Sequence, residues 1–93
     1  MTPEDIAKAH RARAAGEEAK RLMDSSAFAD ALKRVEEKYT REWRASQDTS
    51  VREKLWTKLS VLDDVINDIR VTIGNGDIAA HTLAKEAERD RSK

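Results

Sequence analysis

The residues that could carry chemistry in this 93-residue chain are few, and the densest group is acidic. Asp63, Asp64 and Asp68 lie close together, and Asp64 and Asp68 share one helix face at a spacing of four. A carboxylate pair can bind a divalent cation, but the spacing and hinge glycine of an EF-hand loop are absent. His10 and His81 lie far apart, and neither belongs to an HExxH pattern. We therefore interpret the aspartates as a solvated helix face and the histidines as surface residues, and we expect no metal site.

Two other kinds of catalytic site are equally unsupported by the sequence. The stretch "GNGD" at residues 74–77 contains two glycines, but a phosphate-binding loop follows a strand and needs a longer glycine pattern. Here a helical pattern precedes it, so we interpret it as a helix stop followed by a cap. No serine has a basic partner suggested by the sequence, and there is no cysteine. The sequence predicts a protein that is not an enzyme, without catalytic residues or a cofactor.

A basic, tryptophan-bearing stretch around residues 41–58 is the best candidate for nucleic-acid binding. Trp43 and Trp56 lie among basic residues that could contact phosphates: Arg41, Arg44, Arg52, Lys54 and Lys58. Against this, the chain has 18 basic and 18 acidic residues, so its zero net charge gives no general attraction to nucleic acid. The other interpretation is that the tryptophans pack at the end of a helix pair and the charges form salt bridges on helix surfaces.

The elements that position these residues are predicted to be helical throughout. Residues 17–73 contain neither glycine nor proline and are rich in good helix formers. Thr2 can cap a helix that starts with Pro3, Asp24 to Ser26 can cap the next one, and "SVRE" at 50–53 has the form of a capping box. We expect helices at about 3–23, 26–45, 51–73 and 78–89 in a single domain of residues 1–93.

The apolar residues then define how these helices pack. A heptad-like stripe runs along 51–73: Leu55, Leu59, Leu62, Ile66, Ile69 and Ile73. A narrower stripe on 26–45 includes Phe28, Leu32 and Tyr39, and a short polar connection favours antiparallel packing of the two helices. The predicted fold class is therefore all-α: an antiparallel helical hairpin with an alanine-rich N-terminal helix and a short C-terminal helix, making a small three- to four-helix bundle.

The hairpin helices cannot cover the whole apolar surface by themselves. The outer helices offer only shallow, alanine-rich faces with a few large side chains. They pack either on their own chain or on a neighbour. We therefore expect the chain to bind a protein partner or further copies of itself through these apolar residues: Trp43, Trp56, Val61, Val65, Val71, Ile6, Leu22 and Leu83.

The pattern over residues 28–80 also resembles a type of short helical protein encoded in bacteriophage and prophage genomes. The features that carry the resemblance are Phe28 and Leu32, Trp43 before a short polar loop, "REKLW" at 52–56, and a glycine-bearing stop before a last helix. The resemblance implies a phage accessory or virion-associated protein that acts by binding, and it brings no catalytic residues.

Together these observations predict a non-enzymatic structural, assembly or accessory protein that binds through helices and oligomerises. The alternative is a small nucleic-acid-associated regulator, or an inhibitor of a host or defence complex, that uses the basic turn with its two tryptophans. The N-terminus has no hydrophobic signal core and no run is long enough to span a membrane, so we expect the host cytoplasm or the virion.

Overall fold

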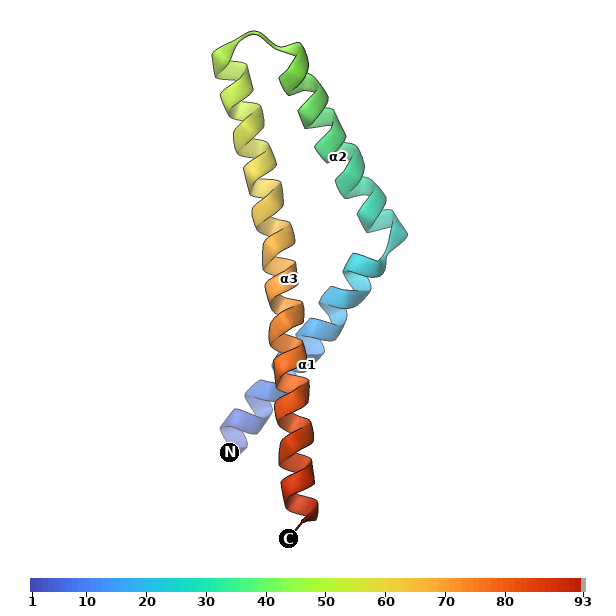
Figure 1. Cartoon of the computed structure of the whole chain (residues 1–93), viewed down its shortest axis with the longest axis vertical. Coiled ribbons are helices and arrows are strands. Elements are labelled where there is room, and N and C mark those ends of the chain that lie inside the picture. Colours follow the sequence, from blue (N-terminus) through green and yellow to red (C-terminus); the bar gives the residue numbers. More distant parts are fainter. Residues whose placement is uncertain (93) are drawn as a thin grey trace. The chain divides into compact units, whose positions relative to one another are not determined.

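The computed structural model describes residues 1–92 and contains three α-helices in that range (Figure 1). Helix α1 spans Pro3–Asp24, α2 spans Ser26–Ala45 and α3 spans Thr49–Arg91. No strand occurs among these described residues, which confirms the prediction of an all-α protein.

The first two helices begin where the sequence predicts. Thr2 caps α1, because its Oγ1 accepts a hydrogen bond from the Asp5 N–H at 3.1 Å. Pro3 occupies the first helical position, where its missing N–H costs nothing. Ser25 caps α2 with its Oγ accepting from the Phe28 N–H at 3.3 Å. One residue, Ser25, therefore separates the two helices.

Helix α3 begins earlier than predicted, and with a different cap. Asp48 is the capping residue: its Oδ1 accepts a hydrogen bond from the Val51 N–H at 3.2 Å, and its carbonyl accepts from the Arg52 N–H at 3.0 Å. The capping box assigned to Ser50 and Glu53 is wrong, since Ser50 already lies within the helix. A carboxylate beside the positive end of a helix dipole is favoured over a neutral hydroxyl two residues further on.

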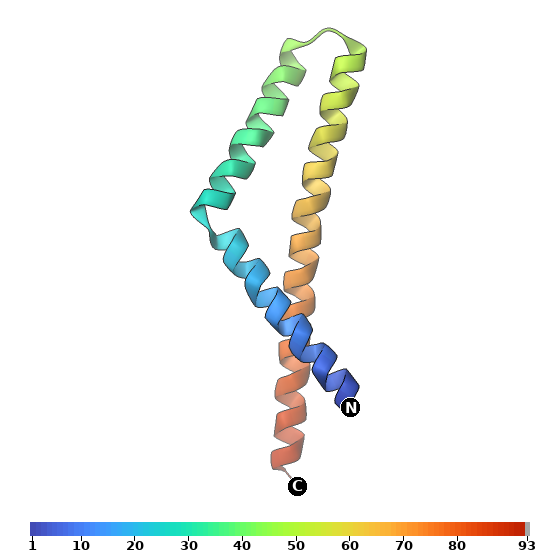
Figure 2. The same cartoon turned by 180° about the vertical axis from the view of Figure 1, so that it is seen from behind.

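The predicted break between helices at 51–73 and 78–89 is also wrong. Helix α3 is continuous for 43 residues and passes through Gly74 and Gly76, which Figure 2 shows as one unbroken ribbon from behind. No glycine within residues 1–92 has a positive φ, so "GNGD" is not a left-handed helix stop. A glycine inside a helix costs only about 1 kcal/mol, and no proline follows to end the helix.

The chain divides into two compact units, which we call the hairpin unit (residues 23–68) and the crossing unit (residues 1–22 and 69–92). The hairpin unit pairs α2 with the first part of α3 across the connection at residues 46–48 (Figure 1). Leu55, near the loop end of α3, is the most buried side chain of this pair, with only 4% of its surface exposed. The predicted antiparallel hairpin is therefore present.

The crossing unit brings α1 against the last part of α3. The two helices cross in both views, with Gly16 of α1 at Gly76 of α3 (Figures 1 and 2). A Cβ placed on Gly76 would lie only 2.7 Å from the Gly16 Cα and 3.1 Å from the Ala12 carbonyl oxygen. The contact is reciprocal, because a Cβ on Gly16 would lie 2.8 Å from the Gly76 Cα and 3.2 Å from the Thr72 oxygen. Gly76 is therefore needed for close backbone approach, not for ending a helix.

Small residues around this crossing let the two backbones touch. Ala79 is buried at 7% exposure, and Ala12 lies one turn before Gly16 on α1. Glycine Cα–H groups that point at carbonyl oxygens of the facing helix give weak hydrogen bonds, and small residues at four-residue spacing permit them. The alanine-rich N-terminal helix therefore packs on its own chain within this unit.

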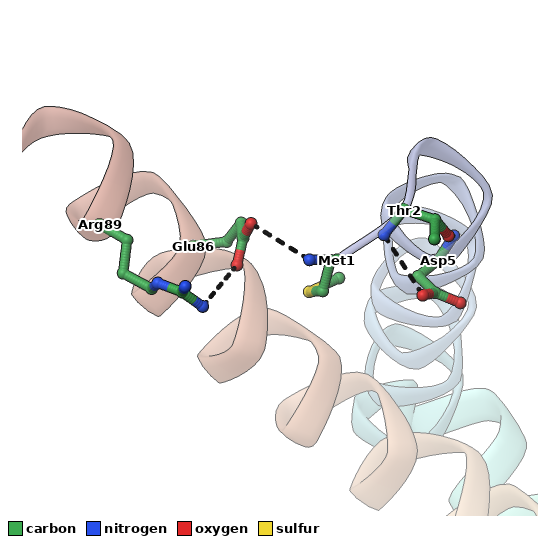
Figure 3. A network of polar contacts seen from close by, with 5 residues as sticks. All are labelled: Met1, Thr2, Asp5, Glu86 and Arg89. Atoms are coloured by element: carbon green, nitrogen blue, oxygen red, sulfur yellow. Dashed lines mark hydrogen bonds and ion pairs between the residues drawn. The ribbon is translucent and has the colours of Figure 1, made fainter. Parts of the chain in front are cut away.

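Polar contacts tie the ends of the crossing unit. Lys20 Nζ lies 2.6 Å from Asp77 Oδ1. The Met1 ammonium lies 3.7 Å from Glu86, which also pairs with Arg89 (Figure 3). These contacts fix an antiparallel direction, since the start of α1 meets the end of α3. Within each unit only two helical segments pair, so neither unit is itself the three- to four-helix bundle that the sequence predicted.

Candidate protein-binding surfaces

Many large apolar side chains of this protein are exposed, and few are fully buried. Across residues 1–92, the apolar residues classed as buried are Leu55 and Ala79 alone. Among the described residues, nine large hydrophobic ones are exposed: Met1, Leu22, Val35, Val51, Trp56, Val61, Val65, Val71 and Ile78. A contiguous exposed apolar surface on a protein marks a site of interaction, whereas single exposed residues do not. The question is therefore which of these residues lie together.

The first group is at the loop end of the hairpin unit and forms what we call the tryptophan notch: Thr40, Trp43, Trp56 and Leu59. Trp43 is half-buried on α2, while Trp56 on α3 has 64% of its surface exposed. The hairpin brings the two tryptophans to one hollow from different helices. An indole with an exposed face beside a second indole can receive an apolar or aromatic group from a partner.

Arg52 completes the wall of this region. Its guanidinium carbon lies 3.7 Å from the centre of the Trp43 ring, and it lines a neighbouring hollow with Trp43 and Trp56. The Arg52 Nε is buried without a hydrogen-bond partner among residues 1–92, and the guanidinium above the indole is attracted to its π face. Arg52 thus holds Trp43 in place and leaves Trp56 as the accessible indole.

The basic residues predicted for nucleic-acid binding do not form one patch. Arg41 and Arg44 lie on an outer face of α2 with Lys33, Glu36 and Glu37. The Lys58 ammonium instead lies 5.4 Å from the Tyr39 ring centre, and Lys54 lies one turn before Lys58 on α3. Arg41 and Arg44 on α2 therefore line a different part of the hairpin surface from Lys58 on α3, and Arg52 is stacked on Trp43.

The second apolar group is formed by Val61 and Val65 on α3. Together with the charged residues Lys58 and Asp68 that flank them, they form what we call the valine edge. Val61 and Val65 are 56% and 49% exposed and share a helix face at a spacing of four. Val65 follows Trp56 by nine residues, which at about 100° per residue places them on opposite sides of α3. The hairpin unit therefore has two separate apolar surfaces, which lie on either side of the helix face that contains the buried Leu55.

The crossing unit contains the remaining predicted partner residues, and the structure separates them into two kinds. Ile6 and Leu83 are half-buried and face one hollow between α1 and α3, so they belong to the contact within the unit. Leu22 and Val71 are exposed. Ile78, at 67% exposure, is not among the partner residues that the sequence predicts, because a helix break was expected at Gly74. In a continuous helix it lies seven residues after Val71, on the same face.

The histidine and acidic side chains do not cluster in the way that the apolar ones do. No group of three or more histidine, cysteine or acidic side chains within residues 1–92 lies in an arrangement that could hold a metal ion. The structure places His10 and His81 exposed in the crossing unit, and Asp63 and Asp64 exposed on α3. Hydrogen bonds from the Thr2 side chain and backbone lower the pKa of the Asp5 carboxyl, which lies in the first turn of α1 (Figure 3).

Among the described helices, none is long and apolar enough to cross a membrane. Comparison of the chain with protein-family models, with curated proteins and with solved structures finds no match.

Proposed function

We propose that this chain is a non-enzymatic assembly or accessory protein of the phage type, which acts in the host cytoplasm or the virion by binding proteins, its own copies included. The observation that supports this is the exposure of large apolar side chains on ordered helices, while little more than Leu55 and Ala79 is buried among the described residues. The phage assignment itself rests on the sequence resemblance over residues 28–80.

Burial of the exposed apolar side chains would supply the free energy of such binding. Complete burial of a valine, leucine or isoleucine side chain contributes about 1.5–3 kcal/mol, and an aromatic side chain buries a larger area. Trp56 and Ile78 are about two-thirds exposed, at 64% and 67%, so a partner that covers either gains a large part of that energy. Residues of this kind in the centre of an interface carry most of its affinity.

The experiment is to follow mass and stability together over a wide range of protein concentration. Light scattering gives the mass, and circular dichroism gives the melting temperature. A protein whose folded state is completed by association melts at higher temperature as its concentration rises. The matched variants are Trp56→Gln, which we expect to weaken binding, and Gln47→Ala, an exposed loop residue without such a role.

The proposal fails if the protein is a monomer at every concentration, melts independently of concentration and retains no protein from extracts of bacteria or of phage-infected cells. It also fails if a catalytic activity appears and is lost on a single polar substitution.

The second candidate function is the nucleic-acid-associated regulator, and the exposed Trp56 beside Arg52 is the observation that favours it. An exposed indole next to a cation can stack an unpaired base. The test is binding of single-stranded DNA and RNA at increasing salt, with the native chain, Trp56→Ala and the double variant Arg44→Glu/Arg52→Glu. Salt-sensitive binding that both variants weaken supports this function, and the absence of binding at low salt excludes it.

A further inference from the structure

We propose that the valine edge pairs with the same edge of a second copy, so that two α3 helices pack antiparallel across a twofold axis. This inference rests on the proposed binding function and names the partner for one of its surfaces. It concerns Lys58, Val61, Val65 and Asp68 in the hairpin unit, and none of the residues of the tryptophan notch.

The spacing of these four residues is the first argument. Val61 follows Lys58 by three positions, Val65 follows Val61 by four, and Asp68 follows Val65 by three. The alternation of three and four keeps all of them on one face of α3, as in a helix that packs against another helix. The order three, four, three reads the same in both directions, so an antiparallel copy matches it in register.

The charges are the second argument. In that register Val61 meets Val65 of the partner subunit and Val65 meets Val61 of the partner subunit. Lys58 then lies beside Asp68 of the partner subunit, and the twofold axis repeats this pair at the other end. A parallel copy would instead bring lysine beside lysine and aspartate beside aspartate. The edge is thus complementary to itself in one direction only, which is the requirement for a closed twofold contact.

The exposure of the edge is the third argument. Val61 and Val65 are 56% and 49% exposed, and both charged residues are at the surface. Lys58 lies 5.4 Å from the Tyr39 ring, which holds its ammonium at this side of the hairpin. The zero net charge of the chain means that two copies approach without repulsion.

The experiment is a charge exchange read by mass in solution at low salt. Lys58→Asp places aspartate beside aspartate at both ends of the contact, and Asp68→Lys places lysine beside lysine. Each single variant should dimerise at least about tenfold more weakly than the native chain. The double variant Lys58→Asp/Asp68→Lys restores both pairs with their signs exchanged, and an equal mixture of the two single variants restores them in a heterodimer.

Matched controls make the same charge changes away from the valine edge. Asp63→Lys lies on the opposite side of α3, five residues before Asp68, and Lys33→Asp lies on an outer face of α2. Both should dimerise like the native chain. Circular dichroism on every variant checks that helix content is kept, and the recovery in the double variant cannot result from a failure to fold.

A label shows the direction of pairing directly. The chain has no cysteine, so Gln47→Cys carries a single spin label in the connection between α2 and α3. With the axis midway between Val61 and Val65, a rise of 1.5 Å per residue puts the Thr49 ends of the two α3 helices, which lie next to the labels, about 40 Å apart. Parallel pairing would put them close together.

Three results overturn the inference: a native chain that is monomeric, a dimer that the single variants do not weaken, or labels that lie close together. An oligomer that survives Lys58→Asp but dissociates with Trp56→Gln refutes this contact and leaves the proposed function standing. A native chain that neither self-associates nor binds any protein refutes both.

Discussion

Gly74 and Gly76 lie two residues apart in one continuous helix, and we expect them to respond differently to the same substitution. A Cβ on Gly74 meets no atom within 4 Å, whereas a Cβ on Gly76 meets the Gly16 Cα at 2.7 Å. Alanine is favoured over glycine in a helix by about 1 kcal/mol at both positions. The difference in unfolding free energy between Gly74→Ala and Gly76→Ala is therefore free of the helix-propensity contribution. It reports only the packing of α1 against α3 at the crossing.

The magnitude of the clash follows from these distances. Carbon atoms pack best at about 3.5–4.0 Å, so a contact of 2.7 Å requires the helices to separate by about 1 Å. The nearest atoms on Gly16 and Ala12 are backbone atoms, which no side-chain rotation can move away. Overpacking of this kind costs about 1–3 kcal/mol. We expect Gly74→Ala to stabilise by about 1 kcal/mol and Gly76→Ala to be about 1–3 kcal/mol less stable than Gly74→Ala.

Urea unfolding followed by far-ultraviolet circular dichroism measures the difference, with the three chains at one protein concentration. Gly16→Ala makes the reciprocal clash, at 2.8 Å from the Gly76 Cα, and should resemble Gly76→Ala. Because either substitution already separates the helices, the double variant should lose less than the sum of the two. If Gly76→Ala stabilises the protein as much as Gly74→Ala does, α1 does not cross α3 at this glycine, and the account of the crossing unit is refuted.

Three further predictions concern the polar contacts. Asp48→Ala should destabilise α3 by about 1 kcal/mol by removing its cap, whereas Ser50→Ala should change stability by less than half as much; urea unfolding of both decides between the two caps. Thr2→Val should raise the pKa of Asp5 toward its ordinary value of 3.8, measured by carboxyl carbon NMR. The native pKa is lowered, so the contribution of Asp5 is present above pH 3.8 and is lost as pH falls through the folded value; an unchanged pKa in Thr2→Val would contradict this. Lys20→Met should cost less than about 1 kcal/mol, because the pair with Asp77 is exposed, and the loss should shrink in 1 M salt.

Much of the local structure could be predicted from the sequence because its signals are local. Pro3 after Thr2 and the serines before Phe28 determine where α1 and α2 begin, and absence of glycine from residues 17–73 favours helix. The alternating apolar stripe around Leu55 predicted the hairpin, because a short polar connection keeps the two apolar helix faces close enough to pack against each other. Trp56, Val61, Val65 and Val71 were expected to face a partner, and all four are exposed, but Trp56 lies on the side of α3 opposite Val65.

The sequence alone could not decide the role of Gly76. A glycine after an apolar helical stretch has the local pattern of a helix stop, and it has the same pattern when another helix crosses there. The difference lies in Gly16, 60 residues away, whose Cα occupies the space that any side chain on Gly76 would need. With the stop removed, Ile78 joins Val71 on one exposed face of α3, and the N-terminal helix finds its contact within the chain. Helix formation was determined by the residues themselves, whereas which surfaces stay open was decided by contacts between residues far apart in the chain.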